Sequence, residues 1–396
     1  MNLTLIAGAR PNFMKIAPII HAIQKAQQGG INIHYRLVHT GQHYDVNMSE
    51  MFFEELDIPR PDVNLGCGGG TQAEQTAAIM IAFEKDLMAN PTDLVIVVGD
   101  VTSTMACSIV AKKMNTKVAH VEAGIRSWDL TMPEEMNRQI TGRIATYNFA
   151  PTPLSKQNLL DEGVNESSIT VTGNTVIDAL NMVVKKIKSN HNLQNDIKDT
   201  LLQSGLPERM VRAFFQPLVT NRRLVLITGH RRENFGNGFL HICEAIKTLA
   251  EKYPDVDFVY PMHLNPNVRK PIKEIFGDWV SNRQSSNSNL YFIEPLEYLP
   301  FVFLMEQSTL VLTDSGGIQE EAPGLGKPVL VMRNTTERPE AVEAGTVKLV
   351  GTNYDLIVSE VSKLLDDPAY YNAMAQATNP YGDGLASKRI IEFLKL

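Results

Sequence analysis

The chain contains few cysteines, and none of them form a pair at metal-ligand or redox spacing. Cys67, Cys107 and Cys243 are the only three in 396 residues, and they are widely separated. An odd number of cysteines without a C-x-x-C motif indicates neither a disulfide framework nor a zinc site. We therefore expect buried, inert thiols and a reducing, cytoplasmic setting.

Long apolar runs and an excess of positive charge are also missing. No apolar run approaches the roughly 18 residues that a membrane span needs, and the N-terminus lacks the basic and apolar regions of a signal peptide. The formal net charge of −7 argues against nonspecific nucleic-acid binding, which needs a basic face. We expect neither membrane nor nucleic acid as a partner. The 43% of hydrophobic residues is that of an ordinary globular protein.

Several well-known phosphate-binding and catalytic motifs are absent. The first predicted strand is followed by Gly8–Asn12, which is not G-x-G-x-x-G, and no acidic residue ends the second strand where a ribose would be bound. The chain has neither G-x-x-x-x-G-K-[ST] nor G-x-S-x-G, and it shows no closed set of metal ligands. We therefore expect an enzyme that uses no nicotinamide and no metal.

Short apolar runs alternate with helical patterns along the whole chain. Continuous aliphatic runs of this length are typical of strands that are covered on both faces. The first series of predicted strands is Leu3–Ala7, Ile33–Val38, Leu94–Val98, Val118–Val121, Tyr147–Ala150 and Ile169–Val171. The second series is Leu224–Ile227, Val256–Tyr260, Tyr291–Ile293, Leu310–Leu312, Val329–Val331 and Val347–Val350. Strand–helix alternation predicts right-handed βαβ units and parallel sheets.

Two strand series predict two domains, because a single core rarely grows past roughly 250–300 residues. A polar, helical segment at about 183–221 separates the series, and we place the boundary after the turn at Thr172–Asn174. The fold class is therefore α/β, with two Rossmann-like, doubly wound parallel sheets at 1–174 and 175–377 facing each other across a cleft. Ligands of such sheets bind beyond the carboxyl ends of the strands.

Three acidic residues follow strands of the first series. Asp100 comes after the third strand, Glu122 ends the fourth, and Glu134 begins the helix after that. Three carboxylates from successive connections at one sheet edge indicate proton transfer or metal binding. Arg10 and Lys15 flank a helix N-terminus at the same edge, a place that favours an anion, and their charge favours proton transfer over a metal.

Each of these carboxylates also has a purely structural interpretation. Asp100 could cap the following helix. Glu122, costly to bury unless paired, could be neutralised by Arg126. Glu134 and Arg138 are one turn apart and could form an ordinary ion pair on the helix surface.

The second half of the chain presents the signs of a diphosphate site. His230 follows a strand and is flanked by two arginines. The turn at 315–317, between a strand and a helix, contains two glycines that would let backbone N–H groups approach a phosphate. Glu321, one helical turn later, could accept hydrogen bonds from ribose hydroxyls, and Arg333 and Arg338 add positive charge. Carboxylates in one predicted domain and a predicted diphosphate-binding site in the other together indicate a nucleotide-sugar enzyme.

The chain resembles the bacterial non-hydrolysing UDP-N-acetylglucosamine 2-epimerases over essentially its whole length. The strings that carry the resemblance are Gly8–Pro11, Gly99–Asp100, His120–Gly124, Pro133–Glu135 with Asn137–Arg138, Thr172–Thr175, Thr228–Glu233, His263–Asn267, Thr313–Pro323, Glu337–Glu340 and Asn379–Gly384.

The resemblance implies a fold shared with many glycosyltransferases, in which the last segment, 378–396, crosses back onto the N-terminal domain and UDP is bound in the C-terminal one. It implies reversible C2 epimerisation by elimination and re-addition of UDP through 2-acetamidoglucal, supplying polysaccharide biosynthesis, in a homodimer. The residues that match the family's catalytic groups are Asp100, Glu122, Glu134 and His230. Those that match its substrate-binding groups are Arg10, Lys15, Arg138, Ser315, Gly316, Gly317, Glu321 and Arg338.

Alternatives to this function remain open at the level of sequence. Many family members have a slightly longer loop than Ser127–Met132, and relatives that act on diacetamido or uronic acid UDP-sugars share the pattern. A glycosyltransferase of the same fold, a hydrolysing epimerase and a catalytically silent UDP-sugar sensor are the other candidates. Some relatives bind a second substrate molecule as activator, and Gln42 and His43 lie in a suitable segment.

Overall fold

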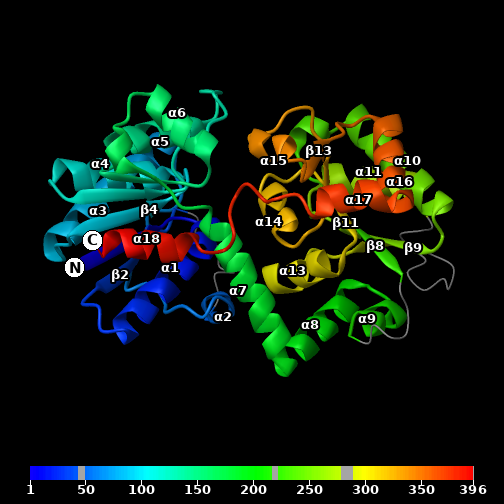
Figure 1. Ribbon diagram of the computed structural model, residues 1–396, viewed down its shortest axis with the longest axis horizontal. Helices are drawn as coiled ribbons and strands as arrows, with labels where there is room; N and C mark the ends of the chain where they lie inside the picture. Colours follow the sequence, from blue (N-terminus) through cyan, green and yellow to red (C-terminus); the bar gives the residue numbers. More distant parts are fainter. Residues whose placement is uncertain (43–49, 216–221, 278–288, 396) are drawn as a thin grey trace. The chain divides into compact units, whose positions relative to one another are not determined.

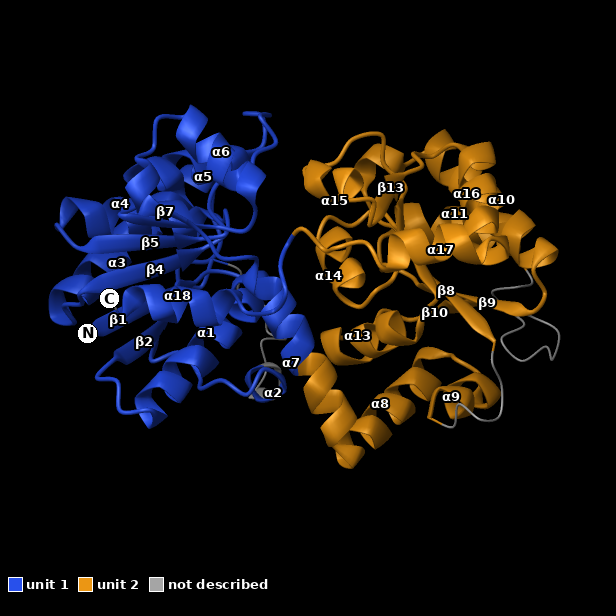
Figure 2. Ribbon diagram, viewed as in Figure 1, with its two compact units in different colours: residues 1–182, 381–396 blue, residues 183–380 orange. Residues whose placement is uncertain are grey.

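The computed structural model describes residues 1–42, 50–215, 222–277 and 289–395, the side chains of 50–52 excepted. The chain divides into two compact units, one formed by Met1–Met182 with Tyr381–Leu396 and the other by Val183–Pro380 (Figure 2). The chain passes from the first unit to the second within a single helix. No helix among the described residues is long and apolar enough to cross a membrane.

The first unit contains a seven-stranded sheet in the order β3-β2-β1-β4-β5-β6-β7, in which all neighbours are parallel. Figure 1 shows strands β2 and β4 of this sheet with the helices of the same unit around them. The strands are β1 (Asn2–Ala7), β2 (His34–His39), β3 (Val63–Asn64), β4 (Leu94–Val98), β5 (Lys117–Val121), β6 (Tyr147–Ala150) and β7 (Ile169–Val171). The helices are α1 (Arg10–Gln28), α2 (Glu50–Glu55), α3 (Gln72–Ala89), α4 (Thr102–Lys113), α5 (Pro133–Ile144), α6 (Pro153–Asp161), η1 (Glu166–Ser168), α7 (Thr175–Ser189) and α18 (Ala386–Leu394).

The sheet of the first unit is covered on both faces, as its strand sequences predict. All five residues of β4 are buried. Helix α4 packs against α3 and α5, whereas α1 packs against α18, the last helix of the chain. Because β1 lies between β2 and β4, the winding direction changes between β1 and β4, and the carboxyl ends of these strands form the edge where such sheets bind ligands.

Helix α18 is anchored to the first unit by aromatic and polar contacts. The Phe393 ring meets Tyr147 and Phe149 edge-on, with centroids 5.3 and 5.4 Å apart. Asp178 of α7 accepts hydrogen bonds from the backbone N–H and the hydroxyl of Ser387, at 2.8 and 2.5 Å. Burial raises the pKa of this carboxyl, against the effect of the hydrogen bonds it accepts.

The second unit contains a six-stranded parallel sheet in the order β10-β9-β8-β11-β12-β13. The strands are β8 (Arg223–Thr228), β9 (Val256–Pro261), β10 (Leu290–Ile293), β11 (Leu310–Thr313), β12 (Val329–Val331) and β13 (Val347–Leu349). The helices are α8 (His191–Ser204), α9 (Glu208–Phe215), η2 (Arg232–Asn234), α10 (Asn237–Lys252), α11 (Pro266–Phe276), α13 (Tyr298–Gln307), α14 (Ile318–Gly324), α15 (Pro339–Glu343), α16 (Tyr354–Asp366) and α17 (Pro368–Ala375). Here the winding direction changes between β8 and β11, which places their carboxyl ends at the ligand-binding edge.

Every strand predicted from the apolar runs is present, with each end within one residue of its predicted position. The fold class, α/β with two doubly wound parallel sheets, is confirmed. β3 was not predicted, because two residues at a sheet edge leave no periodic signal.

Candidate active site

The loop between β1 and α1 is held in place by the side chain of Asn12. Its Oδ1 accepts hydrogen bonds from the backbone N–H groups of Gly8 and Ala9, at 3.1 and 3.0 Å. Its Nδ2 donates to the carbonyl of Val98, 3.1 Å away at the end of β4. The start of α1, with Arg10 as its first residue, is thereby tied to the carboxyl ends of both central strands.

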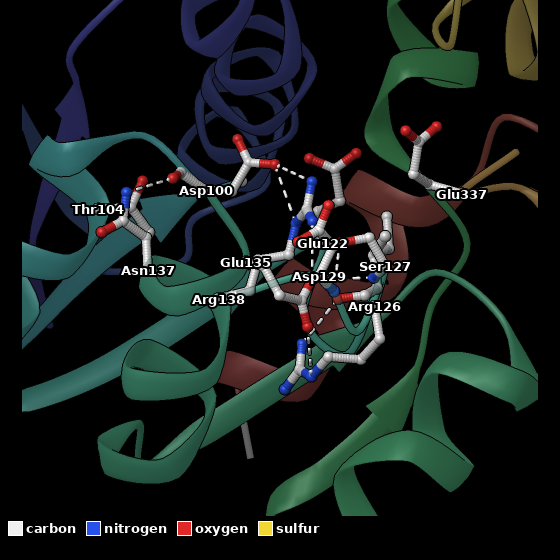
Figure 3. Close-up of polar contacts among 12 residues, drawn as sticks. Asp100, Thr104, Glu122, Arg126, Ser127, Asp129, Glu135, Asn137, Arg138 and Glu337 are labelled. Atoms are coloured by element: carbon white, nitrogen blue, oxygen red, sulfur yellow. Dashed lines mark hydrogen bonds and ion pairs between the residues drawn. The ribbon is translucent and has the colours of Figure 1, made fainter. Parts of the chain in front are cut away.

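Asp100 follows the end of β4 and is paired with Arg138 of α5 (Figure 3). Its Oδ2 accepts from Arg138 Nε at 3.0 Å and from Nη2 at 2.5 Å. Helix α4 is preceded by Val101 in the cap position, so the helix-cap interpretation of Asp100 is wrong. The Asp100 side chain keeps 30% of its surface exposed, which leaves it accessible to a ligand.

Glu122 follows the end of β5 and lies at the same edge as Asp100. Its Oε2 accepts a hydrogen bond from Lys15 Nζ, and its Oε1 accepts one from Asn174 Nδ2 at 3.1 Å. A Cβ on Gly99 would lie 3.2 Å from Oε2, so glycine leaves room for this carboxylate next to Asp100. Lys15, predicted to favour an anion at this edge, thus forms a direct ion pair with Glu122, a partner that the sequence did not predict.

The backbone of Glu122 is in the left-handed region, with φ of +67°. Such a conformation is costly for a residue with a side chain and concentrates at functional sites. The alternative partner, Arg126, is engaged elsewhere: its Nε and Nη2 donate to the two oxygens of Glu162 at 2.6 and 2.7 Å. The interpretation of Glu122 as a structural partner of Arg126 is therefore wrong.

Glu134 and its neighbour Glu135 have opposite environments in the first turn of α5. Glu134 is exposed, whereas Glu135 is fully buried. Arg138 donates from Nη1 to Glu135 Oε2 at 3.0 Å and also pairs with Asp100. Glu135 and Asp100, not Glu134, are therefore ion-pair partners of Arg138. The role of Glu134 in catalysis stays a prediction. Its surface position leaves it open to a ligand.

His120 lies inside β5 and supports the turn that carries Asp100. The ring is completely buried, and its Nε2 is 2.8 Å from the carbonyl oxygen of Gly99. Burial lowers the pKa of His120 to about 4, against the smaller opposing effect of this hydrogen bond. The imidazole is therefore neutral at pH 7 and donates from Nε2. The string His120–Gly124 carries part of the family resemblance, but no role was predicted for His120, because a histidine within an apolar strand indicates no particular chemistry.

His230 follows β8 in the second unit and lies beside the carboxylate of Asp314. The His230 Nδ1 is 3.6 Å from Asp314 Oδ1, and its ring stacks on that of His263 with centroids 5.1 Å apart. Asp314 is buried, and its Oδ2 accepts from the backbone N–H groups of His230 and Arg231, both at 2.8 Å. Partial burial lowers the pKa of His230, and the nearby His263 and Arg231 act in the same direction while Asp314 opposes them.

The turn between β11 and α14 contains the predicted phosphate-binding residues Ser315, Gly316 and Gly317. Gly317 has φ of −64°, and Gly316 has no positive φ either. A Cβ would lie 3.8 Å from Arg231 Nη2 at Gly316 and 3.6 Å from Glu321 Oε1 at Gly317, both ordinary contacts. The fold itself therefore does not demand glycine here. A ligand that approaches the backbone closely would account for both glycines.

Glu321 and Arg338, the remaining candidates of the second unit, both have acidic or phenolic partners. The Tyr298 hydroxyl donates to Glu321 Oε2 at 2.9 Å, and burial raises the pKa of this phenol well above its usual value. Arg338 donates from Nε to Glu320, whose side chain is 3% exposed. The charge of Arg338 is thus already partly balanced within the fold.

Arg333 is buried between two carboxylates. Its Nε donates to Glu233 at 2.6 Å, and its two terminal nitrogens donate to Glu337 at 2.9 and 3.0 Å. Burial alone would raise the pKa of Glu337, but the hydrogen bonds and charge of Arg333 lower it to about 2.

The segment at Gln42 and His43, for which the sequence left an activator site open, is only partly described. Gln42 Oε1 accepts from the backbone N–H and the hydroxyl of Ser103, at 2.9 and 2.7 Å, whereas His43 lies outside the described residues. Within the described ranges, no three His, Cys, Asp or Glu side chains are grouped as a metal ion would need.

Comparisons with known proteins identify the family. The family model described as UDP-N-acetylglucosamine 2-epimerase matches residues 25–395. The UDP-N-acetylglucosamine 2-epimerase of Escherichia coli K12 is 45% identical over 397 residues, which cover 100% of this chain and 98% of the relative. The probable UDP-N-acetylglucosamine 2-epimerase of Ralstonia nicotianae is also 45% identical, over 98% of this chain and 96% of its own.

Solved structures agree with the family match. The UDP-GlcNAc 2-epimerase of Neisseria meningitidis, bound to UDP-GlcNAc, has a TM-score of 0.83 at 42% identity, and the alignment covers 100% of this chain and 99% of that one. The Methanocaldococcus jannaschii enzyme in complex with UDP-GlcNAc and UDP has a TM-score of 0.76 at 40% identity, with the same coverage. The chain therefore belongs to the UDP-N-acetylglucosamine 2-epimerase family.

Proposed function

We propose that this protein interconverts UDP-N-acetylglucosamine and UDP-N-acetylmannosamine, by eliminating UDP and adding it back through 2-acetamidoglucal. One observation carries the proposal within this family. Asp100 and Glu122 follow neighbouring parallel strands at one sheet edge, and each is paired with a cation, Arg138 and Lys15 respectively. Two carboxylates held side by side, each beside a cation, suit the removal and the return of a proton.

The first step breaks two bonds of the sugar. The C1–O bond breaks and its electron pair leaves with the diphosphate. The C2 hydrogen departs as a proton to a carboxylate, and its electron pair forms the C1=C2 double bond. The C2 hydrogen of an acetamido sugar is not acidic enough for direct removal at neutral pH, so cleavage of the C1–O bond must run ahead of proton removal. Cations that stabilise the negative charge developing on the diphosphate favour this cleavage.

The second step reverses the first on the other face of the sugar. A carboxylic acid delivers a proton to C2 from the opposite side, and a phosphate oxygen of UDP attacks C1 to restore the bond. Asp100, Glu122 and Glu134 are the candidates for the base and the acid, and which of them serves which face stays open.

The residues of the second unit are proposed to hold the leaving group. The diphosphate would meet the backbone at Ser315, Gly316 and Gly317, with His230 supplying a hydrogen-bond donor. Glu321 would accept hydrogen bonds from the ribose. Two observations support this assignment: neither glycine is demanded by the packing around it, and the Tyr298 hydroxyl donates a hydrogen bond that orients Glu321. Arg10 and Arg338 are proposed as further sources of positive charge.

Incubation with UDP-N-acetylglucosamine alone in D₂O, followed by NMR, tests the proposal. We expect UDP-N-acetylmannosamine with deuterium at C2, and a slow leak of UDP and 2-acetamidoglucal because the intermediate is held noncovalently. A product that retains its original C2 hydrogen without any free UDP would contradict elimination. Release of free N-acetylmannosamine would indicate a hydrolysing epimerase, and activity only with an added acceptor would indicate a glycosyltransferase. Turnover only of a diacetamido or uronic acid UDP-sugar would correct the substrate.

We also propose a cytoplasmic homodimer. Ile81 and Met88 of α3 expose 57% and 68% of their surface, and a partner subunit packed on this helix would bury them. Light scattering coupled to size-exclusion chromatography gives the mass directly, and a monomer of 44.0 kDa at micromolar concentration would contradict the dimer.

A further inference from the structure

Glu135 is a fully buried carboxylate that the proposed chemistry does not use. It lies in the first turn of α5, next to the exposed candidate Glu134. Its Oε2 accepts from the backbone N–H of Ser127 at 2.9 Å, from the Ser127 hydroxyl at 3.1 Å and from Arg138 Nη1 at 3.0 Å. Its Oε1 accepts from Gln139 Nε2 at 3.0 Å. A buried charge is costly unless it is compensated in this way.

Arg138 connects this buried carboxylate to the accessible one (Figure 3). Nη1 of the guanidinium donates to Glu135, while Nε and Nη2 both donate to Asp100 Oδ2. A guanidinium is planar and its N–H groups point in fixed directions. Fixing Nη1 on Glu135 therefore sets the direction in which the other two donors face Asp100.

The surroundings of Glu135 are rigid enough to act as an anchor. The Arg126 side chain is completely buried, its Nε lies 3.9 Å from Glu135 Oε1, and it is held by Glu162. Ser127, which begins the loop that leads to Glu134, is fixed through both its backbone and its hydroxyl. Glu135 thus joins the loop, the helix and the guanidinium of Arg138 at one buried point.

We propose that Glu135 is a positioning residue. It keeps the Nε and Nη2 donors of Arg138 directed at Asp100 while the charge of Asp100 changes during the reaction. Asp100 is a candidate for gaining and losing a proton, so its attraction for Arg138 varies through the cycle. Glu135 lies out of reach of solvent and supplies a constant negative partner. The inference rests on the proposed function for its kinetic test, but not for its structural one.

Two substitutions of Glu135 remove its hydrogen bonds to different extents. Glu135→Gln keeps an oxygen that can accept from Ser127 and Arg138, whereas Glu135→Met keeps the size and removes every acceptor. We expect kcat to fall about 10-fold in the Gln variant and about 100-fold in the Met variant, the scale of a misplaced catalytic group, with KM changed less than about threefold. Equal losses in both variants, or a loss confined to KM, would overturn the proposal.

Two comparisons separate positioning from a general loss of stability. Glu162→Gln removes the other carboxylate of the same buried network and should lower the Tm without a comparable loss of kcat. In an Arg138→Lys background there is no guanidinium to bridge Glu135 and Asp100. In that background, Glu135→Gln should change kcat less than about threefold. Losses that multiply in the double variant would show that Glu135 does not act through Arg138.

A crystal structure of Glu135→Met tests the geometry without any activity. We expect the Arg138 guanidinium to rotate away from its two-donor contact with Asp100. An Arg138 that keeps both hydrogen bonds to Asp100 Oδ2 would overturn the inference, even if the substrate were another UDP-sugar. A wild-type chain that fails to epimerise any UDP-sugar would instead overturn the proposed function. The crystal structure would then decide by itself whether Glu135 positions Arg138.

Discussion

The side-chain amide of Asn174 lies 3.1 Å from Glu122 Oε1 and donates to it from the turn that precedes α7. Asn174 thereby orients a carboxylate whose other oxygen is held by Lys15.

Asn174→Ala should lower kcat about 10-fold and leave KM nearly unchanged, because a freed carboxylate samples unproductive orientations. Steady-state kinetics measures the split. Asn158→Ala, which removes an amide bonded to the carbonyl of Gly124, is the matched control and should keep kcat. Wild-type turnover in Asn174→Ala would exclude this role.

Removal of each candidate acid or base should abolish most of the chemistry but spare nucleotide binding. We expect Asp100→Asn, Glu122→Gln and Glu134→Gln each to reduce turnover by about 10²–10⁴-fold, the usual contribution of a general acid or base. Calorimetric titration with UDP should give affinities close to wild type. Near-normal turnover in all three variants would show that the site is assigned wrongly.

Tyr298→Phe tests the predicted nucleotide site. The variant leaves Glu321 Oε2 without its phenolic donor, and we expect the Kd for UDP to rise about 5-fold, the effect of roughly 1 kcal/mol from one hydrogen bond. Tyr253→Phe removes a comparable hydrogen bond, to Asp366, and should leave the Kd unchanged. Equal UDP affinity in all three proteins would argue against Glu321 as a ribose ligand.

Activity should not depend on metal or nicotinamide. Elimination and re-addition of UDP need only acids, bases and positive charge. Exhaustive dialysis against a chelator should therefore leave turnover intact, and the denatured protein should release no nicotinamide. A strict requirement for an added divalent cation or for NAD would contradict the mechanism.

The ion pair between Arg333 and Glu337 predicts a pH dependence of stability. The folded-state pKa of Glu337, about 2, is below its ordinary value of 4.5, so the stabilisation is fully present above about pH 4.5 and is lost as the pH falls toward 2. Unfolding monitored between pH 7 and pH 2 should show a smaller acid-induced loss of Tm in Glu337→Gln than in wild type. Parallel curves would indicate that the pair contributes no net stability.

The amino-acid sequence by itself determined every strand except the two-residue β3, and it determined the fold class. Runs such as Leu94–Val98 consist of aliphatic residues only, and a run of this kind is stable only when both faces are covered, so its structure follows from local composition. The shared location of the polar residues that follow the strands was also predicted, because parallel strands bring their carboxyl ends to one edge of the sheet. Lys15, Asp100 and Glu122 meet at that edge as expected from their positions in the chain.

Only the tertiary structure decided which charges form pairs. Spacing alone allowed Glu122 to pair with Arg126, and Glu134 with Arg138, yet Arg126 pairs with Glu162, and Arg138 bridges Glu135 and Asp100. Glu134 and Glu135 are identical and adjacent in the sequence, but one faces solvent and the other is fully buried. An ion pair depends on distances between groups far apart in the chain, and on their burial. Packing sets both, whereas local composition sets neither.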